Sequence, residues 1–124
     1  MDYYFDHEKL QVYQLARELN REVVRLLGRL PRGHADSRDN LRRASMSVSR
    51  NIAEGAGKWR VPDKIHFYQI ARASATECAA SLDELVDCAG LKSGDVEELK
   101  RTAARIVAML ISMIRSLETR TAAN

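Results

Sequence analysis

Residues 96–117, VEELKRTAARIVAMLISMIRSL, decide the fold of this chain. Their apolar side chains recur at spacings of three and four, which places them on one face of an α-helix, as in a coiled coil. Ser93 suits a helix N-cap, and Asp95 and Glu97 supply the acidic charge favoured in a first turn. We therefore expect a helix over about residues 94–118. Its apolar face comprises Val96, Leu99, Ala103, Ile106, Leu110, Met113 and Leu117.

The three preceding segments carry the same helical period and are bounded by helix-breaking residues. Pro62 suits the first position of a helix, because its missing amide proton would have no partner there. The segment Gly55-Ala56-Gly57 is expected to end the second helix and Gly90 the third, since glycine adopts the left-handed C-terminal conformation without steric cost. Pro31 and Gly33 interrupt the chain after the first helix. The expected helices are residues 7–28, 37–55, 62–89 and 94–118.

Short connections between these helices determine the topology. A link of a few residues cannot return the chain along a helix about 30 Å long, so each helix runs back along its predecessor. We therefore predict an all-α fold, an antiparallel up-down-up-down four-helix bundle, in one domain over residues 1–124. The terminal residues 1–6 and 119–124 are expected to be frayed.

The cysteines and the N-terminal residues are typical of a protein from a reducing compartment. Cys78 and Cys88 are ten positions apart on one expected helix, roughly 15 Å, so they cannot form a disulfide with each other. Residues 1–6 lack the basic and apolar regions of a signal peptide. The longest apolar stretch, from Ile106 to Ile114, is about half of the ~20 residues that a membrane span requires. We expect a cytoplasmic protein without a membrane segment.

The sequence contains no pattern typical of a catalytic or metal site. A di-iron bundle uses paired Glu-x-x-His motifs, whereas this chain has one unpaired Asp63-Lys64-Ile65-His66. We predict no metal, no cofactor and no enzyme activity. The alternative is an enzyme built on the carboxylates of Glu54 and Glu77, which would require a concave site with a perturbed pKa.

Polar residues near the seam of the second and third helices are expected to fix how these helices pair. A carboxylate near a seam must find partners, because burying it alone is unfavourable. We interpret these residues as a structural network rather than a functional site. Its members are Asn51, Glu54, Ser74 and Glu77.

Charge distribution is the most informative functional signal. From Arg38 to Arg72 the chain has eight basic and three acidic residues, a net charge of +5 against +3 for the whole chain. Aromatic residues Trp59, His66 and Tyr68 lie among them, which is typical of a surface that contacts phosphates and stacks on bases. A merely solvated face is the alternative. The candidate nucleic-acid-binding residues are Arg42, Arg43, Arg50, Lys58, Trp59, Arg60 and Lys64.

The fourth helix has more apolar residues than one buried face requires. Between Ile106 and Ile114 they cover nearly its whole circumference. A helix on the surface of a monomer needs one apolar stripe, so we expect a second copy to cover the excess.

Several motifs together resemble a known bacterial family. They are Phe5-Asp6-His7-Glu8-Lys9-Leu10-Gln11-Val12-Tyr13, Leu41-Arg42-Arg43-Ala44-Ser45, Asn51-Ile52-Ala53-Glu54-Gly55 and Phe67-Tyr68-Gln69-Ile70-Ala71 with Ser74 and Glu77. Over residues 5–117 the chain resembles the four-helix-bundle proteins named for intervening sequences in 23S ribosomal RNA genes. It is also similar to the accessory variability determinant protein of diversity-generating retroelements, which binds nucleic acid and a reverse transcriptase.

The resemblance implies a homopentamer of bundles with a basic surface and implies no catalytic residue. Together with the charge pattern, it leads us to expect a non-catalytic oligomer that binds nucleic acid, most plausibly RNA. The alternative is an oligomeric scaffold that binds a protein partner without nucleic acid.

Overall fold

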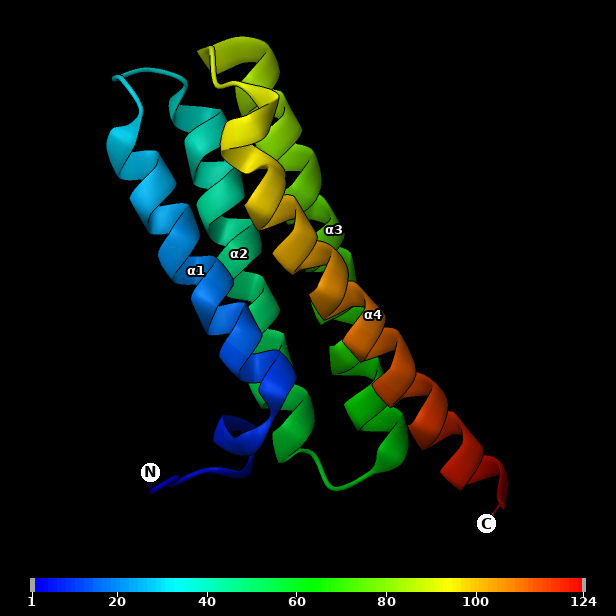
Figure 1. Ribbon diagram of the computed structural model, residues 1–124. Helices are drawn as coiled ribbons and strands as arrows, with labels where there is room; N and C mark the ends of the chain where they lie inside the picture. The colour runs from blue at the N-terminus through cyan, green and yellow to red at the C-terminus, as the bar shows by residue number, and fades with distance from the viewer. Residues whose placement is uncertain (1, 124) are drawn as a thin grey trace.

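The computed structural model describes residues 2–123 and consists of helices (Figure 1). A short 3₁₀ helix, η1 (Asp6–Lys9), precedes α1 (Gln11–Arg29), α2 (Ala35–Gly57), α3 (Val61–Ala89) and α4 (Ser93–Ala123). The described chain contains no strand. The prediction of an all-α four-helix bundle is confirmed.

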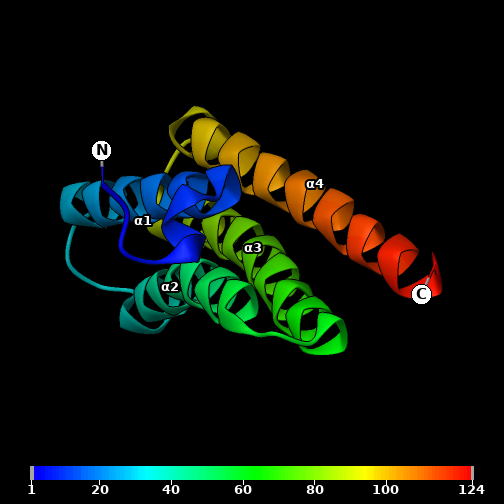
Figure 2. The same ribbon diagram turned by 90° about the horizontal axis from the view of Figure 1, so that it is seen from below.

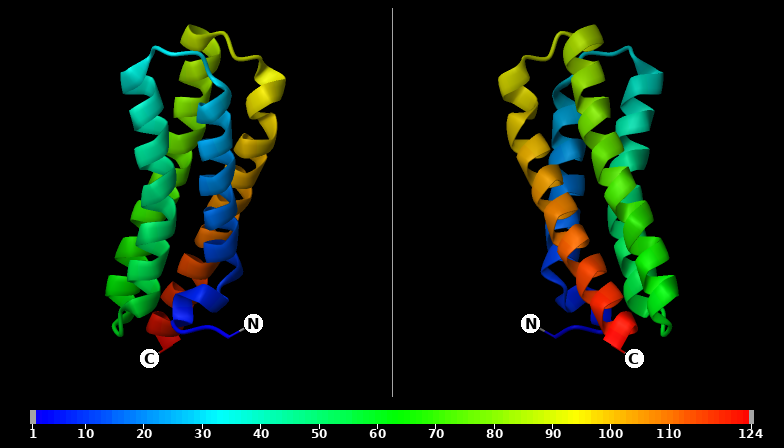
Figure 3. Two further views of the ribbon diagram at one scale, coloured as in Figure 1. Left: turned by 90° about the vertical axis from the view of Figure 1, so that its left-hand side faces the viewer. Right: turned by 90° about the vertical axis from the view of Figure 1, so that its right-hand side faces the viewer.

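The four helices lie at the corners of a square, and each packs against the two helices at the adjacent corners. α2 packs against α1 and α3, and α4 packs against α3 and α1, whereas the backbones of the diagonal pairs do not come within 8 Å of each other, Cα to Cα, within the described residues. Figure 2 looks along the bundle at this arrangement, and Figure 3 shows the α1–α2 and α3–α4 connections at one end. The α2–α3 connection and both chain termini lie at the other end. The α2–α3 pair shares the largest interface.

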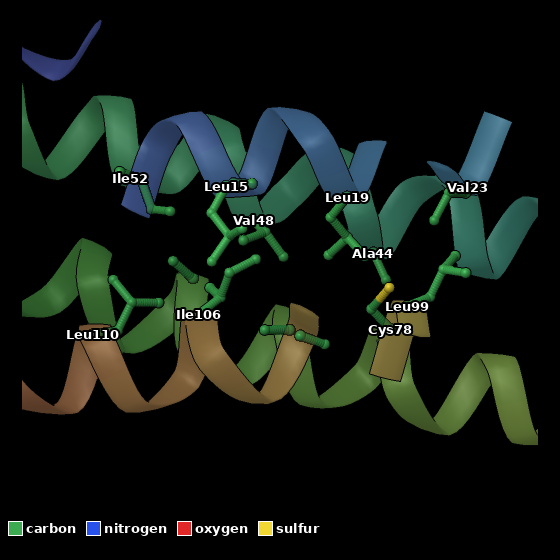
Figure 4. Close-up of a cluster of buried hydrophobic side chains, with 14 of the residues drawn as sticks. Leu15, Leu19, Val23, Ala44, Val48, Ile52, Cys78, Leu99, Ile106 and Leu110 are labelled. Carbon is green, nitrogen blue, oxygen red and sulfur yellow. The ribbon is translucent and has the colours of Figure 1, made fainter. Parts of the chain in front are cut away.

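The core consists of the apolar stripes of all four helices (Figure 4). The predicted stripe of α4 is buried except at Met113, which is half-buried, while Ile114 beside it is buried. Cys78 is fully buried, and its sulfur points toward Ala44 on α2 in Figure 4. None of the described helices has an apolar stretch that could span a bilayer.

The first and last helices differ from their predicted bounds. The first α-helix begins at Gln11 rather than about residue 7, because residues 6–9 form a separate 3₁₀ turn. Glu8 Oε1 accepts hydrogen bonds from the backbone N–H groups of Tyr4 and Phe5, at 3.2 and 2.8 Å, so this end is ordered where fraying was expected. The fourth helix continues past 118 to Ala123. Met1 and Asn124 lie outside the described residues.

The predicted end of the second helix is wrong by two residues. α2 continues through Gly55 to Gly57, and Gly55 is buried within it. An α-hydrogen of Gly55 faces the ring of Tyr68, and a Cβ atom in its place would lie 2.7 Å from Cε1. Gly55 therefore serves close helix packing rather than termination. At the other end, α2 begins at Ala35 instead of about residue 37, after His34 in the left-handed conformation.

The apolar excess of α4 is largely covered within the single chain. Val107, Met109 and Met113 are half-buried and pack against the core. The outward face includes the exposed polar residues Arg101, Arg105, Ser112 and Arg115, but Ala104 and Ala108 are exposed as well and Ile111 is only partly buried. Coverage of the remaining apolar residues by a second copy stays a prediction.

Candidate nucleic-acid interface

Three arginines of α2 lie on its solvent-facing side. Leu41, Ala44, Val48 and Ile52 occupy the opposite, buried side, so the helical period leaves Arg42, Arg43 and Arg50 exposed. No salt bridge or side-chain hydrogen bond engages these three arginines within residues 2–123. They differ in this from the paired Arg101 of α4, which contacts Glu97 and Glu98 at 2.8 and 2.9 Å. The α2 guanidinium groups are free to bind anions.

Arg38, one turn earlier, has a structural role instead. Its guanidinium donates to the carbonyl oxygens of Leu27 at 2.8 Å and Pro31 at 3.2 Å. Leu27 lies in the last turn of α1, where carbonyl groups lack partners one turn further along the helix, and Pro31 lies just beyond the helix end. Arg38 therefore ties α2 to the end of α1.

The α2–α3 connection adds further basic and aromatic groups. Trp59 is 95% exposed and Arg60 is exposed beside it. The ammonium of Lys58 lies 5.0 Å from the ring centroid of Phe67 and 3.9 Å from Oε2 of Glu54. An exposed ion pair at this distance contributes little free energy, about 0–1 kcal/mol, so Lys58 can exchange it for a phosphate.

Lys64 caps α2 rather than facing an external anion. Its Nζ donates to the carbonyl oxygens of Gly55 at 3.3 Å and Ala56 at 3.0 Å. A cation at this position satisfies orphan carbonyls and complements the negative end of the helix dipole. We therefore remove Lys64 from the proposed contact surface, although the sequence placed it there.

The three aromatic residues that lie among these basic residues differ in how far they are exposed to solvent. Tyr68 is buried under Gly55, and burial raises the pKa of its hydroxyl above the ordinary value. The exposed His66 ring lies edge-on to Phe67 at 5.2 Å. Trp59 projects into solvent without covering the core, so it is the aromatic residue of this segment best placed for stacking.

Part of the predicted polar network crosses the α2–α3 interface. Asn51 Nδ2 donates to the carbonyl oxygen of Ser47 at 2.9 Å and to Ser47 Oγ at 3.0 Å. Ser47 Oγ lies 2.8 Å from Ser74 Oγ on α3. Ser47 thus links Asn51 to Ser74, although the sequence analysis did not include it in the network. Such a chain supports the register of the two helices, at about 1 kcal/mol per hydrogen bond.

The two carboxylates expected in that network lie outside it. Glu54 is exposed and pairs with Lys58, and Glu77 is exposed on α3 with no hydrogen-bond partner within the described chain. The two residues form no shared concave site. Glu77 acts on its neighbour instead, because its charge adds to burial in raising the pKa of Cys78.

The N-terminal segment contributes to this surface, although sequence reasoning left it out. An open cleft of about 350 Å³ lies between this segment and the end of α2. The rings of Phe5 and His7 stack at 5.7 Å, and Phe5 is 66% exposed. The run of aromatic residues from Tyr3 to Phe5 was the available signal. The cleft is lined by Phe5, His7, Arg50, Ala53, Glu54, Gly57 and Lys58.

Metal ligands do not gather anywhere in residues 2–123. No three His, Cys, Asp or Glu side chains there come together as a metal site requires. The chemistry that this surface offers is that of free guanidinium groups and the weakly paired ammonium of Lys58, next to exposed aromatic faces.

The sequence matches a known family over most of its length. A profile of the family described as 23S rRNA-intervening sequence protein matches residues 8–112. The chain belongs to this family. The matched region includes all of α2, the α2–α3 connection and most of α4, so the resemblance to the family inferred from its motifs is confirmed.

A solved structure has the same fold. It is the crystal structure of a protein with unknown function from the S23 ribosomal protein family of Bacteroides thetaiotaomicron VPI-5482. The match has a TM-score of 0.74 and 21% sequence identity, and covers 83% of this chain and 97% of that chain. At this identity the similarity supports the fold alone. No curated protein matches the sequence.

Proposed function

We propose that this member of the 23S rRNA-intervening sequence protein family is a non-catalytic RNA-binding protein. The observation that carries the proposal is the set of three unpaired arginines on the solvent side of α2, Arg42, Arg43 and Arg50. Arginine forms bidentate hydrogen bonds with phosphate, and three such groups on one helix favour a polyanion over a single small anion. Arg60 and Lys58 extend the same basic surface toward the α2–α3 connection.

Binding is expected to depend on the phosphate backbone rather than on base sequence. Sequence readout requires side chains held against base edges, whereas these arginines stand on an open helix surface. The proposal includes the resemblance of the sequence motifs to the accessory variability determinant protein of diversity-generating retroelements, which also implies a nucleic-acid ligand.

Salt is expected to weaken the complex strongly. With about three phosphates neutralised on a single strand, affinity should fall roughly twentyfold between 50 and 200 mM salt, because the release of counterions on binding is less favourable at higher salt. Fluorescence anisotropy with labelled RNA measures this slope. The triple variant Arg42→Ala/Arg43→Ala/Arg50→Ala should lose most of the slope and bind roughly twentyfold more weakly at 50 mM.

The matched control is Arg101→Ala, which removes an exposed arginine that already has acidic partners. It should leave both affinity and salt slope unchanged. Absence of binding at low salt, or binding without a salt slope, would contradict the proposal.

A protein-binding scaffold is a second candidate function. The exposed apolar residues Val24 on α1 and Met46 on α2, 59% and 41% exposed, favour it, because a purely phosphate-binding face does not need them. Nuclease treatment before affinity capture separates the two functions. Partners that survive the nuclease support the scaffold, and their loss supports RNA.

The oligomer belongs to the proposal through the family resemblance, which implies a homopentamer. We expect a solution mass close to five times 14.0 kDa, measured by light scattering at several concentrations. A persistent monomer across the range would contradict it. In that case RNA binding through α2 would still stand, because the three arginines belong to one chain.

A further inference from the structure

The N-terminal segment and the α2–α3 connection lie at the same end of the bundle (Figures 1 and 3). Both segments carry exposed aromatic side chains. Tyr4 is 89%, Phe5 66% and Trp59 95% exposed. Large aromatic side chains normally stabilise a protein by leaving water, and these do not. Packing within the chain therefore does not account for them.

Two basic residues line the cleft that Phe5 borders, the unpaired Arg50 and the weakly paired Lys58. Arg50 and Lys58 line the same cleft as the stacked Phe5 and His7, and Trp59 follows Lys58 in the chain. An aromatic face accepts a nucleobase of any sequence, and a guanidinium or ammonium group accepts its phosphate. The cleft thus combines the two contacts that a single unpaired nucleotide requires.

We propose that this aromatic end, defined as Phe5, His7, Arg50, Lys58 and Trp59, binds unpaired nucleotides of single-stranded RNA. The phosphate lies against Arg50 and Lys58, and the base stacks on Phe5 or Trp59. The inference rests on the proposed RNA binding and adds a preference for single strands over duplexes. A paired base is already stacked within its helix and cannot present its face to these rings.

The carboxylate of Glu54 determines which part of the bound nucleotide, the base or the phosphate, lies on its side of the cleft. Its carboxylate lines the cleft and lies 3.9 Å from Lys58. A carboxylate repels phosphate but accepts hydrogen bonds from the amino or imino groups of a base. The base edge therefore faces Glu54, while the phosphate lies on the Arg50 side. Arg50 and Lys58 would attract the carboxylates of an acidic peptide while Glu54 repels them, and such a peptide has no base to stack on Phe5, so the cleft suits a nucleotide better.

Trp59 provides a direct probe, because it is the one tryptophan of the chain. The test titrates the full-length protein with a short oligoribonucleotide and with a duplex of the same strand and its complement. We expect saturable quenching of the Trp59 fluorescence by the single strand and little by the duplex. Phe5→Ala should weaken single-strand binding about tenfold and leave duplex binding unchanged, because stacking is lost only for unpaired bases.

Val24→Ala is the matched control, since Val24 is an exposed apolar residue of α1 that does not line the cleft. It should change neither affinity. Equal affinity for both RNAs without quenching would overturn the inference and leave the proposed RNA binding intact. Absence of binding to either RNA would overturn both. Circular dichroism of each variant checks the fold, which substitutions at exposed side chains should preserve.

Discussion

Gly55→Val is expected to lower the free energy of unfolding by about 3 kcal/mol, near the upper end for an overpacked interface. A Cβ atom at Gly55 would lie 2.7 Å from Cε1 and 2.8 Å from Cδ1 of Tyr68, and 3.3 Å from the carbonyl oxygen of Lys64. Tyr68 is only 4% exposed, so its ring has little room to move. The α2–α3 pair must separate to admit the new side chain. Denaturation by urea measures the change.

The same substitution two residues later provides the control. Gly57 belongs to the same helix, and a Cβ there meets nothing within 4 Å. Gly57→Val should therefore alter stability by about 0.5 kcal/mol or less. Tyr68→Ala should make room at Gly55, so the double variant should lose less free energy than the two single variants together. Equal effects of Gly55→Val and Gly57→Val would contradict the close packing assigned to Gly55.

Gly55 also illustrates why helix ends were the least predictable part of the fold. The periods of the four apolar stripes predicted the four helices, because repeats of three and four are local properties of the sequence. The segment Gly55-Ala56-Gly57 has the composition of a terminator. Whether its first glycine ends a helix or lies beneath a ring depends on Tyr68, which is supplied by another helix. That information is not local.

The candidate site shows the same difference between features that the local sequence determines and features that depend on contacts between helices. Arg42, Arg43 and Arg50 could be predicted as exposed, because the buried positions of α2 determine which side faces water. Lys64 could not be separated from them, since its acceptors are carbonyl oxygens of α2 that only the helix pairing brings within 3.0 and 3.3 Å. Glu77 was expected near the seam between the second and third helices but is exposed. The buried side of α3 contains Ser74 and Cys78, and Glu77 lies on the side that faces solvent.

The N-terminal contribution to the site required the three-dimensional structure. Residues 1–6 have no helical period, and the sequence offered no reason to place them against α2. Glu8 orders this segment by accepting backbone hydrogen bonds from Tyr4 and Phe5. The resulting 3₁₀ turn contacts α2 and carries Phe5 and His7 to the cleft beside Arg50. A local hydrogen-bonding motif thus adds aromatic faces to a basic surface formed by distant residues.

Alkaline pH is expected to destabilise the protein through Cys78. Burial, with a smaller contribution from the charge of Glu77, raises the pKa of its thiol from 9.0 to about 12. Below pH 9 the thiol is protonated in both folded and unfolded states and contributes no pH dependence. Above pH 9 the unfolded chain releases the proton and the folded chain retains it. The free energy of unfolding therefore falls by about 1.4 kcal/mol per pH unit, or about 4 kcal/mol by pH 12.

Comparison with Cys78→Ala isolates this effect from other groups that titrate at high pH. The variant should be less stable than the parent at pH 7, because truncation leaves a small cavity where the sulfur points toward Ala44 (Figure 4). That deficit should shrink as the pH rises above 9 and reverse before pH 12. Cys88→Ala, at an exposed thiol, should follow the parent curve throughout. A deficit for Cys78→Ala that stays constant from pH 7 to 11 would mean that the folded protein tolerates the thiolate, which contradicts its burial between α2 and α3.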